Sequence, residues 1–287
     1  MASIHPTAIL EGEIECAEDV VVGPGCVLRG PLGRPIAIGP GTRLIGRCWL
    51  EGPLRLGARN TVYPFAALGM APQDLKFHPE EPGAGLVIGD ENVFRENVTL
   101  HRATSQERPT AIGSRNYFMA GSHAGHDCQV GDGCILANGA ALGGHVLLGD
   151  RVIIGGGCMV HQFCRIGRGA MLSGGVGTGR DVPPFFTLTG INVVGSINLV
   201  GLRRSGADSA TIEAVRWVYS TLYRRGTAPR GALAALRTRI DEPTVREYIE
   251  FIESSRRGIC PATAVSSRRG TVSMSGPETD PGAAESA

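Results

Sequence analysis

The chain has 287 residues, and its 28 Lys and Arg against 27 Asp and Glu give a net charge of +1. This balance argues against a nucleic-acid binder that relies on a broad basic surface. No apolar run reaches the roughly 20 residues that cross a bilayer, and no basic-then-apolar leader opens the chain. We therefore expect a cytoplasmic protein without a membrane span. Its 42 glycines and 5% aromatic residues are unlike an ordinary globular core.

An apolar residue recurs every six positions, often followed by glycine, and the pattern is most regular between Ile112 and Leu172. A period of six fits neither a helix of 3.6 residues per turn nor an alternating strand. It fits one short strand and one turn per hexad of a parallel β-helix, in which three hexads close a triangular coil. We expect this fold over residues 1–185, with most cysteines among its small buried residues.

Two segments interrupt the hexads in the first half of the chain, residues 71–85 and residues 103–109. Neither fits a strand-and-turn unit, so both should project from the prism. Loops on a rigid scaffold are where binding groups usually lie. The first segment contains Lys76, the only lysine of the chain, whose compact charge suits a phosphate.

The hexads end near Pro183 and Pro184. Because proline cannot donate a hydrogen bond to a strand ladder, we expect coil stacking to stop there. A connector over residues 186–207 should follow. Apolar residues at helical spacing then predict a small helical C-terminal domain over residues 208–258, and the Ser-, Gly- and Pro-rich residues 259–287 are expected to form a disordered tail.

Residues 18 positions apart should lie directly above one another on triangular coils. This places His126, Gly144 and Gln162 in one column, and four of the seven histidines converge on it. Such a cluster could bind a metal, as zinc is bound by three histidines in hydratases on this prism, could supply a general base, or could be a structural stack. The histidines that flank His126 are His123, His145 and His161.

Asp127 follows His126 directly, and a carboxylate there could fix the tautomer of the imidazole, which favours a general base over a metal ligand. Gly144 exposes a backbone N–H that no side chain shields, which suits an oxyanion, although a simple turn glycine is equally compatible. A base beside an oxyanion donor, without a serine or cysteine nucleophile, describes direct acyl transfer to a hydroxyl or an amine.

Six motifs occur in an order that closely resembles the UDP-N-acetylglucosamine O-acyltransferases of lipid A biosynthesis, a hexapeptide-repeat family. The resemblance covers roughly residues 4–258. The motifs are Gln73-Asp74-Leu75-Lys76, His123 through Cys128, Gly143-Gly144-His145, His161 through Cys164, Asp181 through Pro184, and Asn198 with Gly201 through Arg204.

The resemblance implies a left-handed β-helix, a homotrimer, and transfer of an (R)-3-hydroxyacyl group from acyl carrier protein to the glucosamine 3-hydroxyl of UDP-N-acetylglucosamine. It implies no cofactor and no metal. His126 would be the general base, Asp127 its orienting partner and Gly144 the oxyanion donor, while Gly174 would limit acyl length. The residues that would contact substrate or line the cleft are Gln73, Asp74, Lys76, His123, His145, His161, Gln162, Asn198 and Arg204.

The chain departs from the family pattern at Ser122 and at residues 190–193, which concerns acyl length and uridine contacts rather than the base. Three alternatives remain open from the sequence. One is a related transferase that N-acylates an amino sugar nucleotide or uses another acyl donor. The others are a zinc hydratase and a non-catalytic trimeric scaffold on the same prism.

Overall fold

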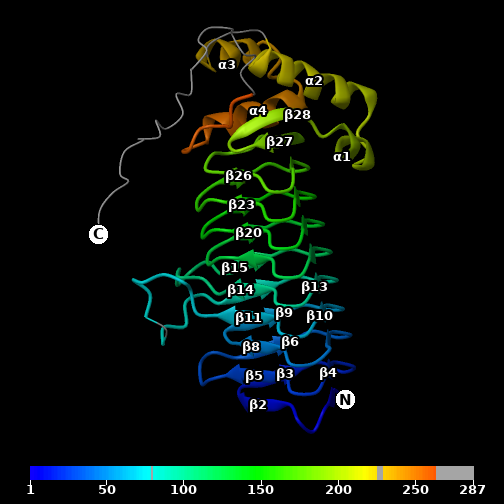
Figure 1. The fold of residues 1–287 in the computed structure, drawn as a ribbon, viewed down its shortest axis with the longest axis vertical. Helices are drawn as coiled ribbons and strands as arrows, with labels where there is room; N and C mark the ends of the chain where they lie inside the picture. The colour runs from blue at the N-terminus through cyan, green and yellow to red at the C-terminus, as the bar shows by residue number, and fades with distance from the viewer. Residues whose placement is uncertain (79, 225–228, 263–287) are drawn as a thin grey trace, which may run out of the picture.

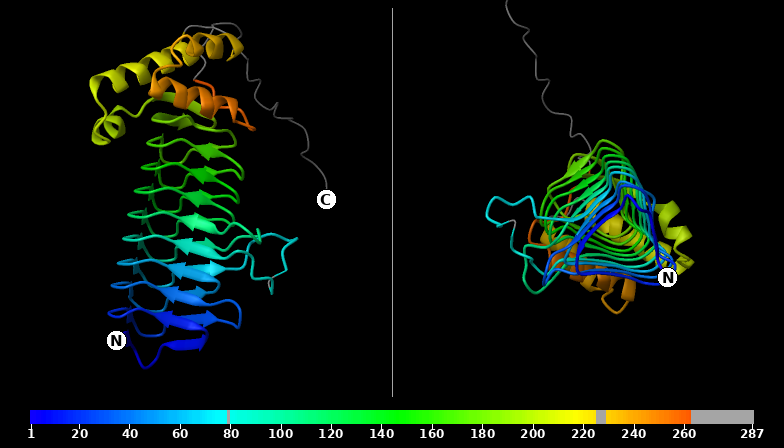
Figure 2. Two further views of the ribbon diagram at one scale, coloured as in Figure 1. Left: turned by 180° about the vertical axis from the view of Figure 1, so that it is seen from behind. Right: turned by 90° about the horizontal axis from the view of Figure 1, so that it is seen from below.

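The computed structural model describes residues 1–78, 80–224 and 229–262. Figure 1 shows a long prism of stacked coils with a group of helices over its C-terminal end. Seen along the prism, the coils are triangular (Figure 2, right). Each coil contributes one short strand to each of three parallel sheets, and the coils wind left-handed. The expected left-handed parallel β-helix with a small helical region is therefore confirmed.

The three faces of the prism are named sheets A, B and C, in the order in which each coil visits them. Sheet A contains β1 (Ser3–Ile4), β4 (Val21–Val22), β7 (Arg43–Leu44), β10 (Thr61–Val62), β13 (Val93–Phe94), β16 (Tyr117–Phe118), β19 (Ile135–Leu136), β22 (Ile153–Ile154), β25 (Met171–Leu172), β27 (Phe186–Gly190) and β28 (Val193–Ile197).

Sheet B contains β2 (Ile9–Gly12), β5 (Val27–Gly30), β8 (Trp49–Glu51), β11 (Ala67–Met70), β14 (Thr99–His101), β17 (His123–Ala124), β20 (Ala141–Leu142), β23 (Met159–Val160) and β26 (Gly177–Thr178). Sheet C contains β3 (Ile14–Cys16), β6 (Ile36–Ile38), β9 (Leu54–Leu56), β12 (Leu86–Ile88), β15 (Thr110–Ile112), β18 (Gln129–Val130), β21 (Leu147–Leu148) and β24 (Arg165–Ile166).

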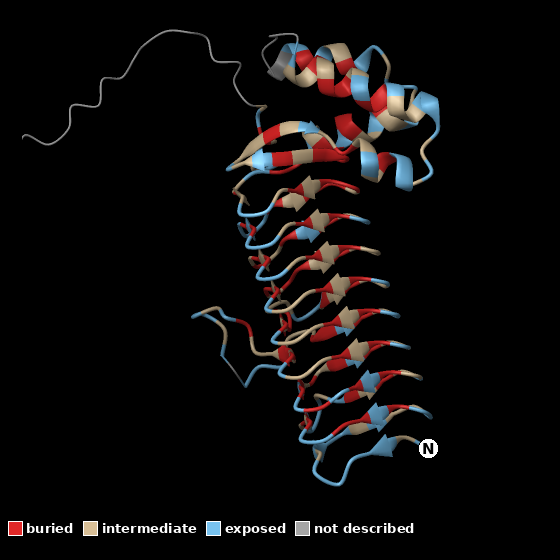
Figure 3. Cartoon of the chain, turned by 45° about the vertical axis from the view of Figure 1, so that its right-hand side comes forward, coloured by how far each residue is buried: buried red, intermediate tan, exposed pale blue. Residues whose placement is uncertain are grey.

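The core is the inside of the prism, where the apolar residue of each hexad stacks on its equivalent one coil away. Phe118, Leu136, Ile154 and Leu172 form one such stack in successive strands of sheet A, and none of them is exposed. Burying side chains of this size stabilises the fold by about 1.5–3 kcal/mol each. Buried residues follow the inner side of the coils along the prism (Figure 3). All eight cysteines are unpaired, and all except Cys16 are buried, as expected for small core residues.

The two predicted insertions lengthen the spacing between paired strands, and β11 also shifts register against β14 between Leu68 and Met70. Regular coils pair residues 18 positions apart. Ala67 instead pairs with Thr99, 32 residues along, across residues 71–85. Thr99 pairs with His123, 24 residues along, across residues 103–109. Both insertions are thus accommodated outside the ladder, and the larger one projects from one corner of the triangle (Figure 2).

A third, shorter insertion was not predicted. Val27 pairs with Trp49, 22 residues along, so the extra residues lie between β5 and β6. All three insertions leave the prism where a strand of sheet B is followed by a strand of sheet C, namely between β5 and β6, β11 and β12, and β14 and β15. We call this corner the B–C edge.

The expectation that stacking stops at Pro183 and Pro184 is wrong. β27 pairs in parallel with β25, through Met171 and Thr187, and β28 then closes an antiparallel hairpin on β27. Both prolines lie in the turn that leads from sheet C back to sheet A, where the ladder needs no donor from them. The expected connector therefore contains a hairpin that extends sheet A.

Four helices are described after the hairpin: α1 (Leu199–Arg204), α2 (Ser209–Tyr223), α3 (Pro229–Arg237) and α4 (Pro243–Glu253). Asp208 caps α2 by accepting from the backbone N–H of Thr211. After α4, Ile259 and Ala262 form bridges with Asp181 and Val194, so residues 259–262 are bound to the prism and are not a tail. Residues 263–287 lie outside the described residues. Among the described helices, none has the length and apolarity that would span a membrane.

Candidate active site

The predicted column lies on the B–C edge, on the C-terminal side of the insertions. His126 follows β17, and Gly144 and Gln162 follow β20 and β23. These three strands pair in an unbroken 18-residue register, so the three turns stack on one another. The next residue in each turn, Asp127, His145 and Phe163, has a positive φ of 61°, 60° and 65°. Such a left-handed backbone is uncommon outside glycine, and the same conformation recurs in all three turns of the column.

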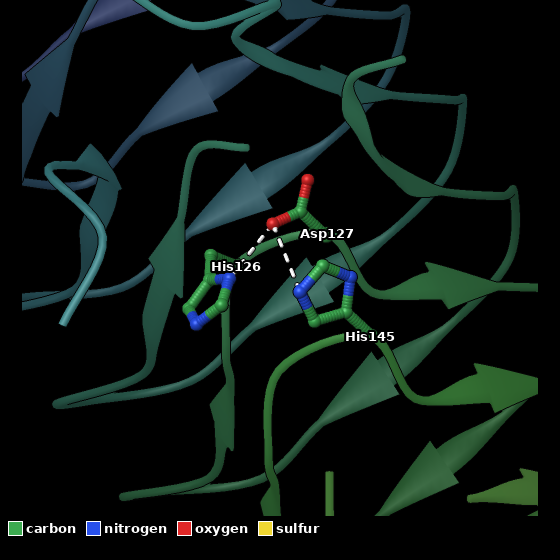
Figure 4. Close-up of side chains that lie close together, drawn as sticks. All are labelled: His126, Asp127 and His145. Atoms are coloured by element: carbon green, nitrogen blue, oxygen red, sulfur yellow. Dashed lines mark hydrogen bonds and ion pairs between the residues drawn. The ribbon is translucent and has the colours of Figure 1, made fainter. Parts of the chain in front are cut away.

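The imidazole of His126 is bound by the carboxylate that follows it. His126 Nδ1 lies 2.7 Å from Asp127 Oδ2. Figure 4 shows Asp127 between the rings of His126 and His145, whose Nε2 is 3.6 Å from the same oxygen. The backbone N–H of Asp127 donates to Thr110 Oγ1 at 2.7 Å, which supports the unusual backbone conformation of the aspartate.

Three further hydrogen bonds reach the Asp127 carboxylate from the second insertion. The N–H and hydroxyl of Thr104 donate to Oδ2 at 3.1 and 2.7 Å, and the N–H of Ser105 donates to Oδ1 at 3.1 Å. Burial alone would raise the pKa of Asp127, but these bonds and the one from His126 outweigh it and hold the pKa far below its usual value. An ionised carboxylate can only accept, so His126 carries its proton on Nδ1 and presents a lone pair on Nε2.

Gly144 lies directly against the His126 ring. A Cβ built on Gly144 would be 2.7 Å from both Cε1 and Nε2 of His126, so any side chain here would displace the ring. The neighbouring N–H groups of Gly143 and His145 donate to Val160 and His126. Within the described residues the N–H of Gly144 has no such acceptor, which leaves a donor beside His126 Nε2.

His126 and Gly144 open into a hollow of about 760 Å³ on the sheet B side of the edge. An apolar floor from Ala141, Met159 and Val160 continues toward the C-terminal coils. Five of the predicted residues besides Gly144 line this hollow, together with His101, which the sequence did not predict. They are Gln73, His123, His126, His161 and Gln162.

Two histidines of the hollow are held neutral by burial. His101 Nδ1 is bonded to the carbonyl of Ala71 at 2.6 Å and His123 Nδ1 to Thr99 Oγ1 at 2.8 Å. Burial lowers the pKa of both imidazoles, that of His123 to about 4, with smaller contributions from the neighbouring histidines. The Nδ1 atoms of these two neutral imidazoles are bound to a hydroxyl and a carbonyl. In His126, by contrast, the Nδ1 proton is bound by a carboxylate.

His145 lies on the opposite side of the edge. Its ring stacks on Phe163 with centroids 4.5 Å apart, and burial lowers its pKa despite the nearby Asp127. Together with Asp127 these rings line a second hollow of about 950 Å³ on the sheet C side. The edge thus separates two hollows, and His145 does not face the same space as His126. The basic residues of this second hollow are Arg108, Arg165, Arg256 and Arg257.

The first insertion is anchored by a buried arginine. The Arg102 side chain is fully buried, and its guanidinium donates to Glu51 Oε1 and to the carbonyls of Gly69 and Glu81. Gln73 reaches the first hollow from this insertion. Asp74 and Lys76 do not line this hollow. Asp74 Oδ1 accepts a hydrogen bond from the backbone N–H of Lys76, and the Lys76 residue is exposed.

Three of the predicted residues lie apart from the histidines. Gly174 is in a turn between sheets A and B, where a built Cβ would meet nothing closer than the Gly156 carbonyl at 3.6 Å. Asn198 caps α1 by accepting from Gly201 N, and its amide donates to Gly169. Arg204 is in the last turn of α1. None of these three lines either hollow.

The described residues contain one group that could hold a metal, since donor atoms of His126, Asp127 and His145 lie within 4.8 Å of one another. Its chemistry does not suit a cation. Asp127 Oδ2 already accepts from His126 and from both donors of Thr104, so three hydrogens occupy the direction from which an ion would bind. We therefore treat the group as a hydrogen-bonded pair with a neighbouring histidine.

Comparisons with known proteins agree with this geometry. A family model described as UDP-N-acetylglucosamine O-acyltransferase, domain 2, matches residues 181–260, and a bacterial transferase hexapeptide model of six repeats matches residues 109–144. An acyl-[acyl-carrier-protein]--UDP-N-acetylglucosamine O-acyltransferase of Halorhodospira halophila is 43% identical over 90% of this chain and 99% of its own. The chain belongs to the UDP-N-acetylglucosamine O-acyltransferase family.

Other members of the family show the same extent of similarity. The enzyme of that name from Syntrophobacter fumaroxidans is 40% identical over 89% of this chain and 98% of its own. The crystal structure of UDP-N-acetylglucosamine O-acyltransferase from Moraxella catarrhalis superposes with a TM-score of 0.82 at 37% identity, covering 90% of this chain and 99% of that one. The family fold therefore includes the prism, the hairpin and the helices.

Four residues that form or support the site were not predicted from the sequence: His101, Arg102, Thr104 and Phe163. The ring of His101 meets that of His123 edge to face, with centroids 5.3 Å apart, but an insertion of unknown path separates the two positions. Hexad counting does not cross such a loop. Phe163 could have been found, because it is 18 residues after His145.

Proposed function

We propose that the protein transfers an (R)-3-hydroxyacyl group from acyl carrier protein to the 3-hydroxyl of UDP-N-acetylglucosamine, the first step of lipid A biosynthesis. Membership of the family supports the substrates. One structural observation carries the chemistry: His126 is fixed by Asp127 with its Nε2 lone pair beside the unpaired N–H of Gly144.

In the proposed reaction His126 Nε2 removes the proton of the sugar 3-hydroxyl as its oxygen attacks the thioester carbonyl. Negative charge develops on the carbonyl oxygen, which accepts a hydrogen bond from Gly144 N–H. When the carbon–sulfur bond breaks, the proton held on Nε2 passes to the departing thiolate of the carrier. Asp127 stabilises the imidazolium between these two transfers and is not itself protonated.

A homotrimer would bring the remaining predicted residues to the site. Asn198 and Arg204 lie apart from His126 within one chain, so a contact of either with the same nucleotide requires a neighbouring subunit. Exposed apolar side chains, Met159 on sheet B at 67% exposure and Phe163 in a turn of the B–C edge at 52%, support such packing. We place the nucleotide near Gln73, Asp74 and Lys76 and expect the enzyme to act in the cytoplasm.

The acyl chain is proposed to extend from Gly144 along the apolar floor toward Gly174. The space around Gly174 is open, and the neighbouring Gly175, Val176 and Gly177 line the hollow. A glycine at this turn therefore suits a long acyl chain, and a larger residue would shorten the chain that the enzyme accepts.

The direct test is to incubate the purified protein with UDP-N-acetylglucosamine and a series of (R)-3-hydroxyacyl carrier proteins of increasing chain length. We expect an O-acylated nucleotide sugar, identified by mass and by loss of the acyl group in mild base. A parallel reaction with an amino sugar nucleotide tests N-acylation. Acyl transfer to the amine alone, or to neither acceptor, would contradict the proposal.

A further inference from the structure

The second insertion folds back onto the catalytic pair. Its backbone is tied to the first insertion, since Ala103 N–H donates to Gly85 and Ser105 accepts from Ala84. Ser105 Oγ accepts from the N–H groups of residues 107 and 108, which closes the loop on itself. These bonds hold Thr104 and Ser105, the two residues of the loop that donate to Asp127.

One carboxylate oxygen receives the hydrogen bonds of both His126 and Thr104. The Thr104 hydroxyl donates to Asp127 Oδ2 at 2.7 Å, the same length as the bond from His126 Nδ1 to that oxygen. The other donors to the carboxylate are backbone N–H groups, from Thr104 and Ser105. Among the described residues, the hydroxyl is therefore the one side-chain donor, apart from the imidazoles, that a substitution can remove without altering the backbone bonds.

We propose that Thr104 is a positioning residue whose hydroxyl, by sharing Asp127 Oδ2 with His126, limits how strongly this carboxylate holds a second proton on the imidazole. A hydrogen bond donated to a carboxylate withdraws negative charge from its oxygen. The imidazolium is then stabilised enough to form during the reaction but releases its proton readily to the leaving thiolate. This role rests on the proposed function of His126 as the general base.

Other charged or titratable groups face the pair from each neighbouring element. His101 comes from β14, His123 from β17, His145 from the turn after β20, and Asp74 from the first insertion. Arg108 from the second insertion lines the hollow that Asp127 borders. None of these groups changes when the Thr104 hydroxyl is removed, so a shift in pH dependence is attributable to that hydroxyl.

The test compares Thr104→Val, which removes the hydroxyl at nearly constant volume, with Thr104→Ser, which keeps it. We expect Thr104→Val to move the acidic limb of the kcat profile to higher pH and to lower kcat near pH 6 by about tenfold, with KM for both substrates unchanged. Thr104→Ser should follow the wild type. Thr42→Val, which removes the hydroxyl of a fully buried threonine far along the prism, controls for general destabilisation.

A second measurement does not depend on acyl transfer. In protein labelled at the histidine rings, with signals assigned by His126→Gln, NMR follows the pH midpoint of the His126 imidazole without substrate. An upward shift in Thr104→Val that Thr104→Ser lacks supports the inference even if the acceptor sugar proves to be another one. An unshifted midpoint and kinetic profile, or an equal loss in Thr42→Val, would overturn it.

Discussion

The ring of His126 lies on the backbone of Gly144, one coil further along the prism, so closely that a Cβ on Gly144 would be 2.7 Å from its Nε2. This contact brings the lone pair of the base against Gly144, whose N–H has no acceptor among the described residues. The coil register that stacks β17 on β20 fixes the separation between His126 and Gly144.

Replacing Gly144 by alanine should therefore disable the site without unfolding the prism. The added Cβ displaces the His126 ring while the backbone N–H remains, and we expect kcat to fall by about a hundredfold or more, as for a misplaced general base. Gly156→Ala is the matched control, because the nearest atom to its built Cβ is the Asn138 carbonyl at 3.4 Å. Equal activity of the two variants in the carrier-protein assay would refute the role of Gly144.

His126→Ala should abolish acyl transfer while leaving the fold intact, since the side chain belongs to a turn and not to the core. The expected loss is about 10²–10⁴-fold in kcat, the usual contribution of a general base. Circular dichroism and sedimentation of the variant check that fold and assembly are retained. Near-normal turnover by His126→Ala would exclude it as the base.

Arg102→Met should loosen the first insertion. It removes the buried guanidinium that joins Glu51 to the insertion carbonyl of Glu81, and we expect a loss of about 3 kcal/mol in the free energy of unfolding. KM for the nucleotide sugar should rise as well, because Gln73 is carried on that segment. Arg59→Met breaks an exposed pair with Glu91 and should change both quantities far less.

Stability should fall as the pH is lowered from 6.5 to about 4, partly because of His123. An unfolded histidine binds a proton below its ordinary pKa of 6.5, whereas burial holds the folded His123 unprotonated to about 4. The unfolded state therefore binds more protons across this window. Urea unfolding at several pH values should show a shallower pH dependence in His123→Gln than in the wild type. His101 contributes in the same direction and keeps some slope in the variant.

Most of the fold followed from one number in the sequence, the period of six. It placed His126 above Gly144 because both residues belong to unbroken hexads, and the register confirms that arithmetic. Handedness did not follow from the period and came from the resemblance to the family. The hairpin of β27 and β28 was missed because Pro183 and Pro184 were expected to end the ladder, whereas they occupy a turn.

The surroundings of the base were harder to predict, since they depend on loops. Thr104 and His101 are brought to Asp127 and His123 by insertions whose path the hexads do not determine. The backbone of the column also matters. His145 lies beside His126 as expected, with ring centroids 5.1 Å apart, but it lines the hollow on the sheet C side, which residue spacing alone does not show.

The three insertions at the B–C edge also indicate how such an enzyme can diversify. At that edge a segment can leave one strand and return to the next while the parallel ladders continue, as residues 31–34, 71–85 and 103–109 do, the second beside a register shift between Leu68 and Met70. A residue added within a strand would instead move every following side chain of that strand to the opposite face of the sheet. Substrate preference can therefore evolve, or be engineered by loop grafting, along a single corner while the prism is inherited unchanged.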